Sequence, residues 1–307
     1  MAHSSTKVIM AALIGNFLIA ITKFAAAWYT RSSAMLSEGI HSTVDTGNQL
    51  LLLWGMRQSK KPADPRFPFG HGKEIYFWSF VVAILLFSLG AGISFYEGVI
   101  HMLHPEPMEN VFVNYIVLML AVVFEGASCY VAFTEFSKVK GDFNLMQAIK
   151  RGKDPTMFVV LFEDIAALLG LVIALIGISI AIYTGDARYD GMASMVIGLL
   201  LGVTAILLAY ETKSLLIGES ANPEIVAGIN EILDNLDVVN HVNEVLTMHM
   251  GPEYILANVS IDFADHLSSD QIENVVSELD RQIKSSYPLV KRIFIEAEAW
   301  KSSAMST

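Results

Sequence analysis

The sequence predicts an α-helical polytopic membrane protein with six transmembrane helices and a small cytoplasmic α+β domain at its C-terminal end. Hydrophobic residues make up 53% of the 307 positions and charged residues 17%, whereas a soluble domain carries about 25% charged residues. The apolar residues gather in six segments that reach the roughly 20 residues needed to cross a bilayer core. After residue 218 the hydropathy falls, which indicates a separate soluble domain.

The six apolar segments define a transmembrane domain over residues 1–218. The fifth segment has a clear helix start, because Asp154 can cap the first turn and Pro155 fits the first helical position. We expect the spans at residues 7–29, 33–57, 74–102, 111–135, 156–184 and 190–216.

Basic residues concentrate in alternate connections between the expected spans. The other connections contain only Arg31 and Arg188, and the segment HPEPMEN contains no basic residue. Because basic connections stay on the cytoplasmic side of a membrane, we expect both chain termini in the cytoplasm. The basic residues are Arg57, Lys60, Lys61, Arg66 and Lys73 after the second span, and Lys138, Lys140, Lys150, Arg151 and Lys153 after the fourth.

The soluble domain, residues 219–298, reads as helix, strand, strand, helix and strand. This order favours a ferredoxin-like sandwich with both helices on one face of a sheet. The net charge of −11 comes largely from this domain and gives no indication of nucleic-acid binding. The segments are NPEIVAGINEILDNL, VNEVLTMHM, EYILANVSIDF, SSDQIENVVSELDRQIKSS and VKRIFIEAE, and we expect residues 299–307 to form a flexible tail.

The second span carries polar residues that a lipid-facing helix lacks. Its polar positions fall within about 100° of one another on a helix, and apolar residues occupy the opposite side. His41 and Asp45 are four residues apart, so their side chains can converge on one ion, and imidazole and carboxylate both bind zinc. Charged groups are costly inside a membrane and therefore indicate function; the alternative is a helix–helix contact that only fixes packing. The polar positions are Glu38, His41, Asp45, Asn48 and Gln49, of which Glu38 can instead pair with a base near the outer rim.

Two further spans carry carboxylates at a similar depth. At 1.5 Å per residue from the cytoplasmic end of each span, Asp45 lies about 18 Å deep, Glu125 about 15 Å and Asp164 about 13 Å. The spans offer few cations besides Lys23, so a cation from solution is the simplest partner for these carboxylates. Glu163 and Asp164 point about 100° apart on a helix. We expect Asp164 to face the second span and Glu163 to serve as a proton or packing group.

These residues resemble the motifs of the cation diffusion facilitator family of divalent metal/proton antiporters. The matching features are His41-x-x-x-Asp45, Asp164, the loop PADPRFPFGHGK before the third span, six spans and a small C-terminal domain. The segments LSEGIHSTVDTGNQ, HPEPME, DPT and LFEDIAALLG are similar to the zinc transporter nine branch of animal mitochondria. The long N-terminal extension of that branch is missing here, so we expect a bacterial relative in the inner (cell) membrane.

The resemblance implies a tetrahedral transport site with two ligands from the second span and two from the fifth. His41, Asp45 and Asp164 correspond to three of these ligands, and the fourth position is Val160, which cannot bind a metal. The fourth position of the coordination shell is then filled by Glu125, by Glu163, by water or by nothing.

The resemblance also implies a second site in the loop before the third span. Asp64 and His71 correspond to its ligands, whereas Phe67 stands where a further histidine is sometimes found. The alternative for this loop is a simple turn. Lys73 corresponds to a family cation that holds two protomers together through an acidic partner, for which Glu219 is the candidate.

The C-terminal domain of the family resembles a copper chaperone, forms dimers and often binds zinc. In this chain His266 corresponds to one ligand, while Glu296 and Glu298 stand where a histidine and a carboxylate are common. Other ligand positions are occupied by Asn243 and Val259. We therefore regard these as weak zinc candidates, and we expect three histidines to be ordinary surface residues: His241, His249 and His266.

Metal and protons compete for such a site, because ligands must lose their protons before they bind a metal. We therefore expect proton-coupled efflux of a divalent cation by a homodimer in a lipid bilayer, with no prosthetic cofactor. Imidazole and carboxylate ligands favour zinc, with manganese, iron or cobalt as alternatives. Two other classes are an intramembrane metal-dependent hydrolase, for which no HExxH motif is present, and a membrane scaffold that transports nothing.

Overall fold

The computed structural model describes residues 2–105, 111–140 and 152–300. The chain divides into two compact units, a helical unit (Met1–Lys60 and Glu74–Lys213) and a soluble unit (Lys61–Lys73 and Ser214–Thr307). The loop before the expected third span therefore belongs to the soluble unit. Lys150 and Arg151 of the expected basic connection, and residues 301–307 of the expected tail, lie outside the described residues.

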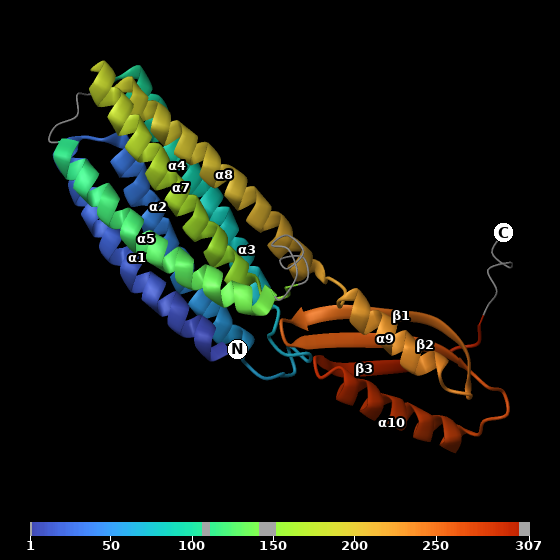
Figure 1. Ribbon diagram of the computed structural model, residues 1–307. Helices are drawn as coiled ribbons and strands as arrows, with labels where there is room; N and C mark the ends of the chain where they lie inside the picture. Colours follow the sequence, from blue (N-terminus) through green and yellow to red (C-terminus); the bar gives the residue numbers. More distant parts are fainter. Residues whose placement is uncertain (1, 106–110, 141–151, 301–307) are drawn as a thin grey trace, which may run out of the picture. The chain divides into compact units, whose positions relative to one another are not determined.

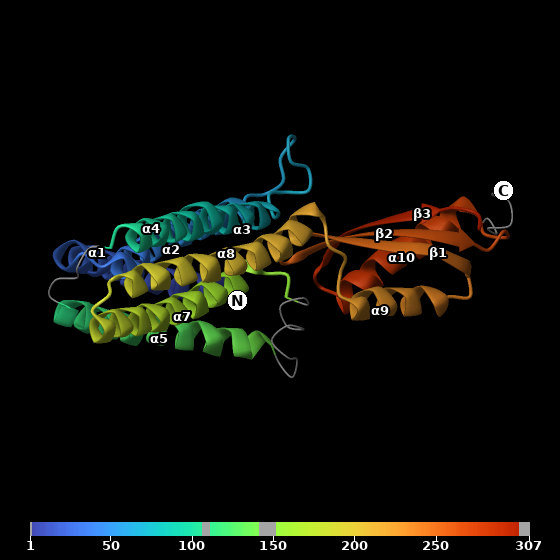
Figure 2. The same ribbon diagram turned by 90° about the horizontal axis from the view of Figure 1, so that it is seen from above.

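The helical unit is a bundle of long helices that lie side by side (Figures 1 and 2). A π-helical segment, η1 (Leu86–Ala91), joins two of them into one continuous span, and it packs against α2. Such π segments are frequent at functional sites. The helices are α1 (Ala2–Thr30), α2 (Ser33–Ser59), α3 (Glu74–Leu85), α4 (Gly92–Leu103), α5 (Val111–Lys140), α7 (Pro155–Thr184) and α8 (Arg188–Ile217).

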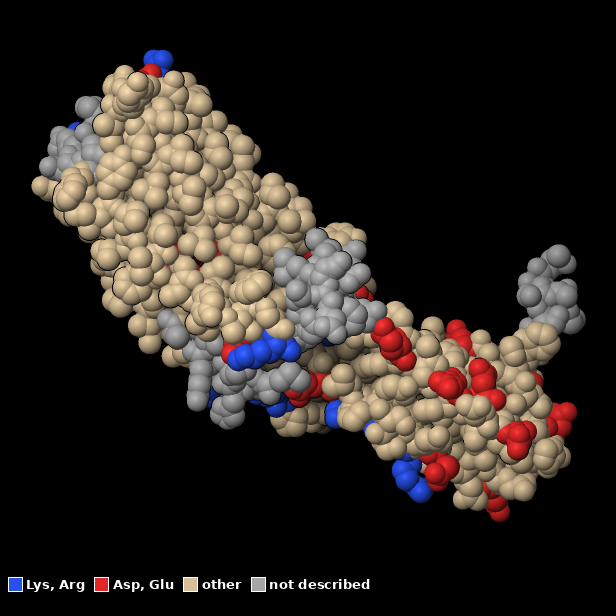
Figure 3. Space-filling model, in the orientation of Figure 1, with Lys and Arg blue, Asp and Glu red and all other residues tan. Residues whose placement is uncertain are grey.

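Five helical segments of the described chain are long and apolar enough to cross a membrane: Ala12–Thr30, Glu74–Leu103, Phe112–Lys138, Pro155–Thr184 and Arg188–Ile217. On the face that Figure 3 shows, acidic and basic side chains are rare along the middle of the bundle. The remaining predicted span, α2, is a helix of 27 residues. Its mean hydropathy is low because it carries the polar stripe, and those polar side chains are buried inside the bundle.

Helix starts and close helix contacts follow from local sequence. As predicted, Asp154 caps α7, and its side chain accepts a hydrogen bond from the backbone N–H of Thr156 at 3.0 Å. Helices α4 and α8 approach closely at Gly98 and Gly191, where a Cβ atom on Gly98 would lie 2.7 Å from the carbonyl oxygen of Gly191. Small residues permit this kind of backbone contact between membrane helices.

The soluble unit has the predicted order of elements. Strands β1 and β2 pair antiparallel and β2 and β3 pair parallel, which makes a sheet in the order β1-β2-β3. Alternate residues of β2 from Ile255 to Phe263 are buried in one core with residues of both helices, so both helices cover the same face of the sheet. The elements are α9 (Pro223–Asp234), β1 (Val239–Gly251), β2 (Tyr254–Phe263), α10 (Ser269–Ser286) and β3 (Val290–Ala297).

Candidate metal site

The polar stripe of α2 faces the interior of the bundle. Each residue of the stripe is 2% exposed or less: Glu38, His41, Asp45, Asn48 and Gln49. A helix with this composition cannot face lipid on that side, so neighbouring helices must provide the partners. The residues that surround the stripe come from α1, α5 and α7.

His41 and Asp45 form the centre of the stripe. They are separated by one helical turn, and His41 Nε2 lies 3.2 Å from Asp45 Oδ2. This close contact does not count as a hydrogen bond: both ring nitrogens of His41, and Oδ1 of Asp45, are buried without a hydrogen-bond partner. The pair therefore offers nitrogen and oxygen lone pairs to a further ligand.

The two neighbouring carboxylates of α7 contact different helices. Asn48 Nδ2 donates a hydrogen bond of 2.6 Å to Glu163 Oε1, which links α7 to α2. Ser128 Oγ donates a hydrogen bond of 2.9 Å to Asp164 Oδ2, which links α7 to α5. Asp164 is nevertheless close enough to Asp45 and His41 to interact with them electrostatically.

Lys23 on α1 is the cation of this region. Its Nζ lies 3.1 Å from Glu38 Oε2 and donates a hydrogen bond of 2.8 Å to Ser42 Oγ. Glu125 on α5 lies 4.0 Å from the same Nζ, and neither of its carboxylate oxygens has a hydrogen-bond partner. Glu38 thus pairs with a base, as predicted, but this base lies inside the bundle rather than at its rim, because Lys23 is fully buried.

The described residues contain no group of three or more histidine, cysteine or acidic side chains arranged to hold one metal ion. The structure brings His41 and Asp45 together and places Asp164, Glu125 and Glu163 around them without closing a coordination shell. Val160, one turn before Asp164, is a buried apolar residue. Binding of one ion by residues of both α2 and α7 therefore requires their side chains to move closer together.

The loop between α2 and α3 brings Asp64 and His71 together, at 3.0 Å between Asp64 Oδ2 and His71 Nε2. Asp64 Oδ1 also accepts hydrogen bonds from the backbone N–H groups of Arg66 and Phe67, both at 2.8 Å. The hydrogen bond from His71 and that from Phe67 lower the pKa of Asp64. These hydrogen bonds shape the turn, and the role of Asp64 and His71 as a second metal site stays a prediction.

Lys73, at the end of this loop, contacts Met248 of β1, with 3.5 Å between Nζ and Sδ. Partial burial lowers the pKa of the Lys73 ammonium. Its pairing with Glu219 stays a prediction.

The weak candidates of the soluble unit lie in different environments. His266 is exposed in the turn before α10, and Glu296 of β3 pairs in register with Ser260 of β2. Glu298 Oε2 accepts a hydrogen bond of 3.2 Å from Ser260 Oγ, which gives this carboxylate a structural role.

The prediction that His249 lies on the surface is wrong. It is 2% exposed near the end of β1, where its backbone N–H donates to the carbonyl oxygen of Glu219 at 2.9 Å. The segment that contains Glu219 runs beside this part of β1. The sequence pattern of β1 does not reveal this neighbour. His241 is exposed, as predicted, and its ring packs against Trp300 with 5.0 Å between ring centroids.

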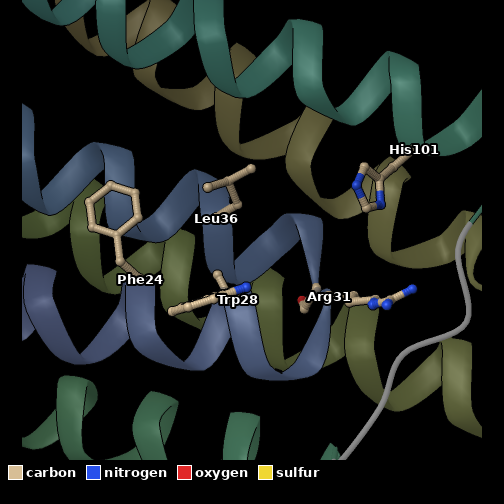
Figure 4. A pocket seen from close by; sticks show the side chains of 7 residues that line it. Phe24, Trp28, Arg31, Leu36 and His101 are labelled. Carbon is tan, nitrogen blue, oxygen red and sulfur yellow. The ribbon is translucent and has the colours of Figure 1, made fainter.

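A cavity of about 450 Å³ lies between α1, α2 and α4, on the α1–α2 turn side of the polar stripe. Figure 4 shows Phe24 and Trp28 on α1, Leu36 on α2 and His101 on α4 around it. This cavity could not be predicted from the sequence, because its lining is mostly apolar and comes from three helices and the turn between α1 and α2.

Comparison with known proteins places this chain in one family. Residues 9–217 match the family model described as the cation efflux transmembrane domain. The chain is 35% identical over 292 residues to the proton-coupled zinc antiporter SLC30A9, mitochondrial, of Xenopus laevis, with 92% of this chain and 52% of that protein covered. It is 36% identical over 260 residues to the human protein of the same name, with 84% and 46% covered.

A bacterial relative is similar over most of both chains. The cation-efflux pump FieF of Citrobacter koseri is 24% identical over 279 residues, which cover 91% of this chain and 88% of that protein. The chain spans about half the length of the SLC30A9 proteins that it matches.

Proposed function

Because the chain belongs to the cation efflux family, we propose that it exports a divalent metal cation, zinc, in exchange for protons. His41, Asp45 and Asp164 together bind the transported ion, and this site opens alternately to each side of the membrane. The observation that carries this proposal is the buried His41–Asp45 pair, whose ring nitrogens and Asp45 Oδ1 have no hydrogen-bond partner. Two relatives with this activity in their names support the choice of zinc and of protons.

The chemistry of these side chains supports exchange of a metal for protons. An imidazole and carboxylates bind zinc through nitrogen and oxygen at about 2.0–2.2 Å, and all of them must be deprotonated to do so. When the metal leaves, the same buried groups take up protons, because isolated carboxylates are unfavourable in an apolar environment. One set of side chains therefore carries either the metal or the protons.

Alternating access provides the conformational step. Asp164 is held by Ser128 of α5, while His41 and Asp45 lie on α2. For these three residues to share one metal ion, α7 must move toward α2. We propose that this approach accompanies the change between states open to opposite sides.

We further propose that two copies of the chain assemble in the lipid bilayer through their soluble units, with both termini on the cytoplasmic side. The basic connections after α2 and α5 support this orientation. The inner membrane of a bacterium stays our expectation for its location. Family membership disfavours both a hydrolase and a scaffold that transports nothing.

The test is zinc flux in proteoliposomes that contain a zinc-sensitive dye. Under a pH gradient the unmodified protein should move zinc, and His41→Ala or Asp45→Ala should lower the initial rate by at least about tenfold, as expected for removal of one metal ligand. His241→Ala, which removes an exposed histidine of the soluble unit, is the matched control and should leave the rate unchanged. Flux that is independent of the pH gradient, or that persists in His41→Ala, would contradict the proposal.

A further inference from the structure

We infer that the buried Lys23–Glu38 ion pair is the gate that closes the transport site toward the outer end of the bundle. The outer end is defined here as the end at which α1 stops and α2 begins, at residues 30–33. This inference rests on the proposed function, because a gate is needed only if the ion passes through the bundle.

The ion pair joins all four helices that surround the candidate metal site. Lys23 of α1 contacts Glu38 and Ser42 of α2, and its Nζ lies 4.0 Å from Glu125 of α5. Glu38 in turn lies against α7 at Gly170, where a Cβ atom would come within 2.5 Å of Glu38 Oε1. Among the described residues, Lys23 is the only lysine or arginine that is buried.

Glu38 lies between His41 and the outer end along α2, and the Lys23 ammonium lies beside the site, between Glu38 and Ser42. Helix α2 runs inward from Ser33, so Glu38 precedes His41 by three residues, or about 4.5 Å along the helix axis. The cavity of Figure 4 is lined on α1 and α2 only by residues on the outer side of the pair, from Phe24 to Leu36. Along α2, therefore, Glu38 separates that cavity from His41 and Asp45.

The outer end is closed by further hydrogen bonds between helices. Ser32 Oγ donates to Asp190 Oδ1 of α8 at 3.0 Å, and Thr30 Oγ1 donates to Asn114 Oδ1 of α5 at 2.5 Å. These contacts and the ion pair hold the same end of the bundle together. A cation that leaves outward must therefore pass the Lys23 ammonium, which repels it while it stays beside Glu38.

A purely structural ion pair is the competing explanation. Removing one partner of a buried pair leaves an uncompensated charge and destabilises a protein whatever the role of the pair. A test of the gate must therefore neutralise both partners, and it must measure access from the outer end to the metal site rather than the stability of the protein. The variant Lys23→Met/Glu38→Gln removes both charges with side chains of similar size.

Thiol labelling from the outer side measures this access. In a Cys129→Ser background, Gln49→Cys places a thiol on the inner side of Glu38 and His41, where the native residue is 1% exposed. This position leaves the hydrogen bond from Lys23 to Ser42 in place. With the pair intact, a membrane-impermeant thiol reagent should label this cysteine slowly. With Lys23→Met/Glu38→Gln, the labelling rate should rise by about tenfold or more, because loss of the pair shifts the population toward the open state.

The matched control is Lys138→Met/Glu135→Gln, which neutralises an ion pair near the inner end of α5 and should leave labelling unchanged. Gly170→Ala is a second, independent variant, since its added methyl displaces the Glu38 carboxylate without changing any charge. Gly170→Ala should also accelerate labelling, and it replaces the double variant as the test of the gate if the double variant does not fold.

Unchanged labelling in the folded variants, with only a lower thermal stability, would overturn the gate and leave the pair a structural contact. Zinc flux of the unmodified protein is measured in the same liposomes. Its absence would overturn the proposed function, whereas normal zinc flux with unchanged labelling would overturn only the gate.

Discussion

Buried polar atoms without hydrogen-bond partners lie mainly on the α2 stripe and on the carboxylates that face it, within the described residues. They include His41 Nδ1, Asp45 Oδ1, Glu163 Oε2 and both oxygens of Glu125. Each such atom costs about 1–3 kcal/mol when it is buried without a partner. A bundle stabilised only for packing would gain by replacing them with apolar groups, so the residues themselves favour a site that receives a cation or protons.

The Asp64–His71 contact allows a pH prediction outside the membrane. Since the folded-state pKa of Asp64 is lowered, its contribution to loop stability is present above the unfolded pKa of about 3.9. That contribution is lost as the pH falls through the lower folded-state pKa. His71→Ala should raise the pKa of Asp64 toward its ordinary value, measured by carbon NMR of labelled aspartate in detergent micelles.

Two hydrogen bonds from backbone N–H groups remain in that variant, so the rise in pKa should be partial. His241→Ala is the control, because it removes a histidine distant in sequence from the loop. An unchanged Asp64 pKa in His71→Ala would show that the backbone alone holds the carboxylate.

At the scale of the secondary-structure elements, the sequence predicted most of the fold because each helix or strand has its own periodic pattern. The start of α7 at Pro155 and the order of α9, β1, β2, α10 and β3 are confirmed by the structure. The partners of Glu163 and Asp164 could not be predicted, because they depend on how α2, α5 and α7 are rotated against one another. The π-helical segment within the third span could not be predicted either, because the sequence around Leu86 is apolar and has no feature that distinguishes a π-helix from an α-helix.

The contact between α4 and α8 gives a prediction at this scale. A Cβ atom on Gly98 would lie 2.6 Å from the backbone nitrogen of Met195, so Gly98→Ala must push the two helices apart. We expect a loss of about 1–3 kcal/mol in the free energy of unfolding, measured by thermal or denaturant unfolding in detergent.

Gly126→Ala on α5 is the matched control, because nothing lies within 4 Å of its added methyl. This variant should be neutral or slightly stabilising, since alanine favours a helix more than glycine does. Equal stability of the two variants would contradict a close contact at Gly98.

For the whole molecule, the two units differ in how their polar side chains are used. In the helical unit, buried charged groups of α1, α2, α5 and α7 surround one region without forming a closed set of ligands. In the soluble unit, the residues that correspond to zinc ligands are exposed, as His266 is, or serve the sheet, as Glu298 does. We therefore expect the metal of the intact protein to be held mainly in the helical unit.

Zinc binding by the intact chain tests this distribution. Equilibrium dialysis of the detergent-purified protein at neutral pH should give one tightly bound zinc per chain, and Asp164→Asn should weaken binding by at least about tenfold. The affinity should fall as the pH falls, because protons compete for His41, Asp45 and Asp164. The variants His266→Ala and Glu298→Gln should still bind one zinc per chain. A loss of zinc in either variant would show that the soluble unit holds the metal. A second zinc that disappears in Asp64→Asn would instead assign an ion to the Asp64–His71 loop.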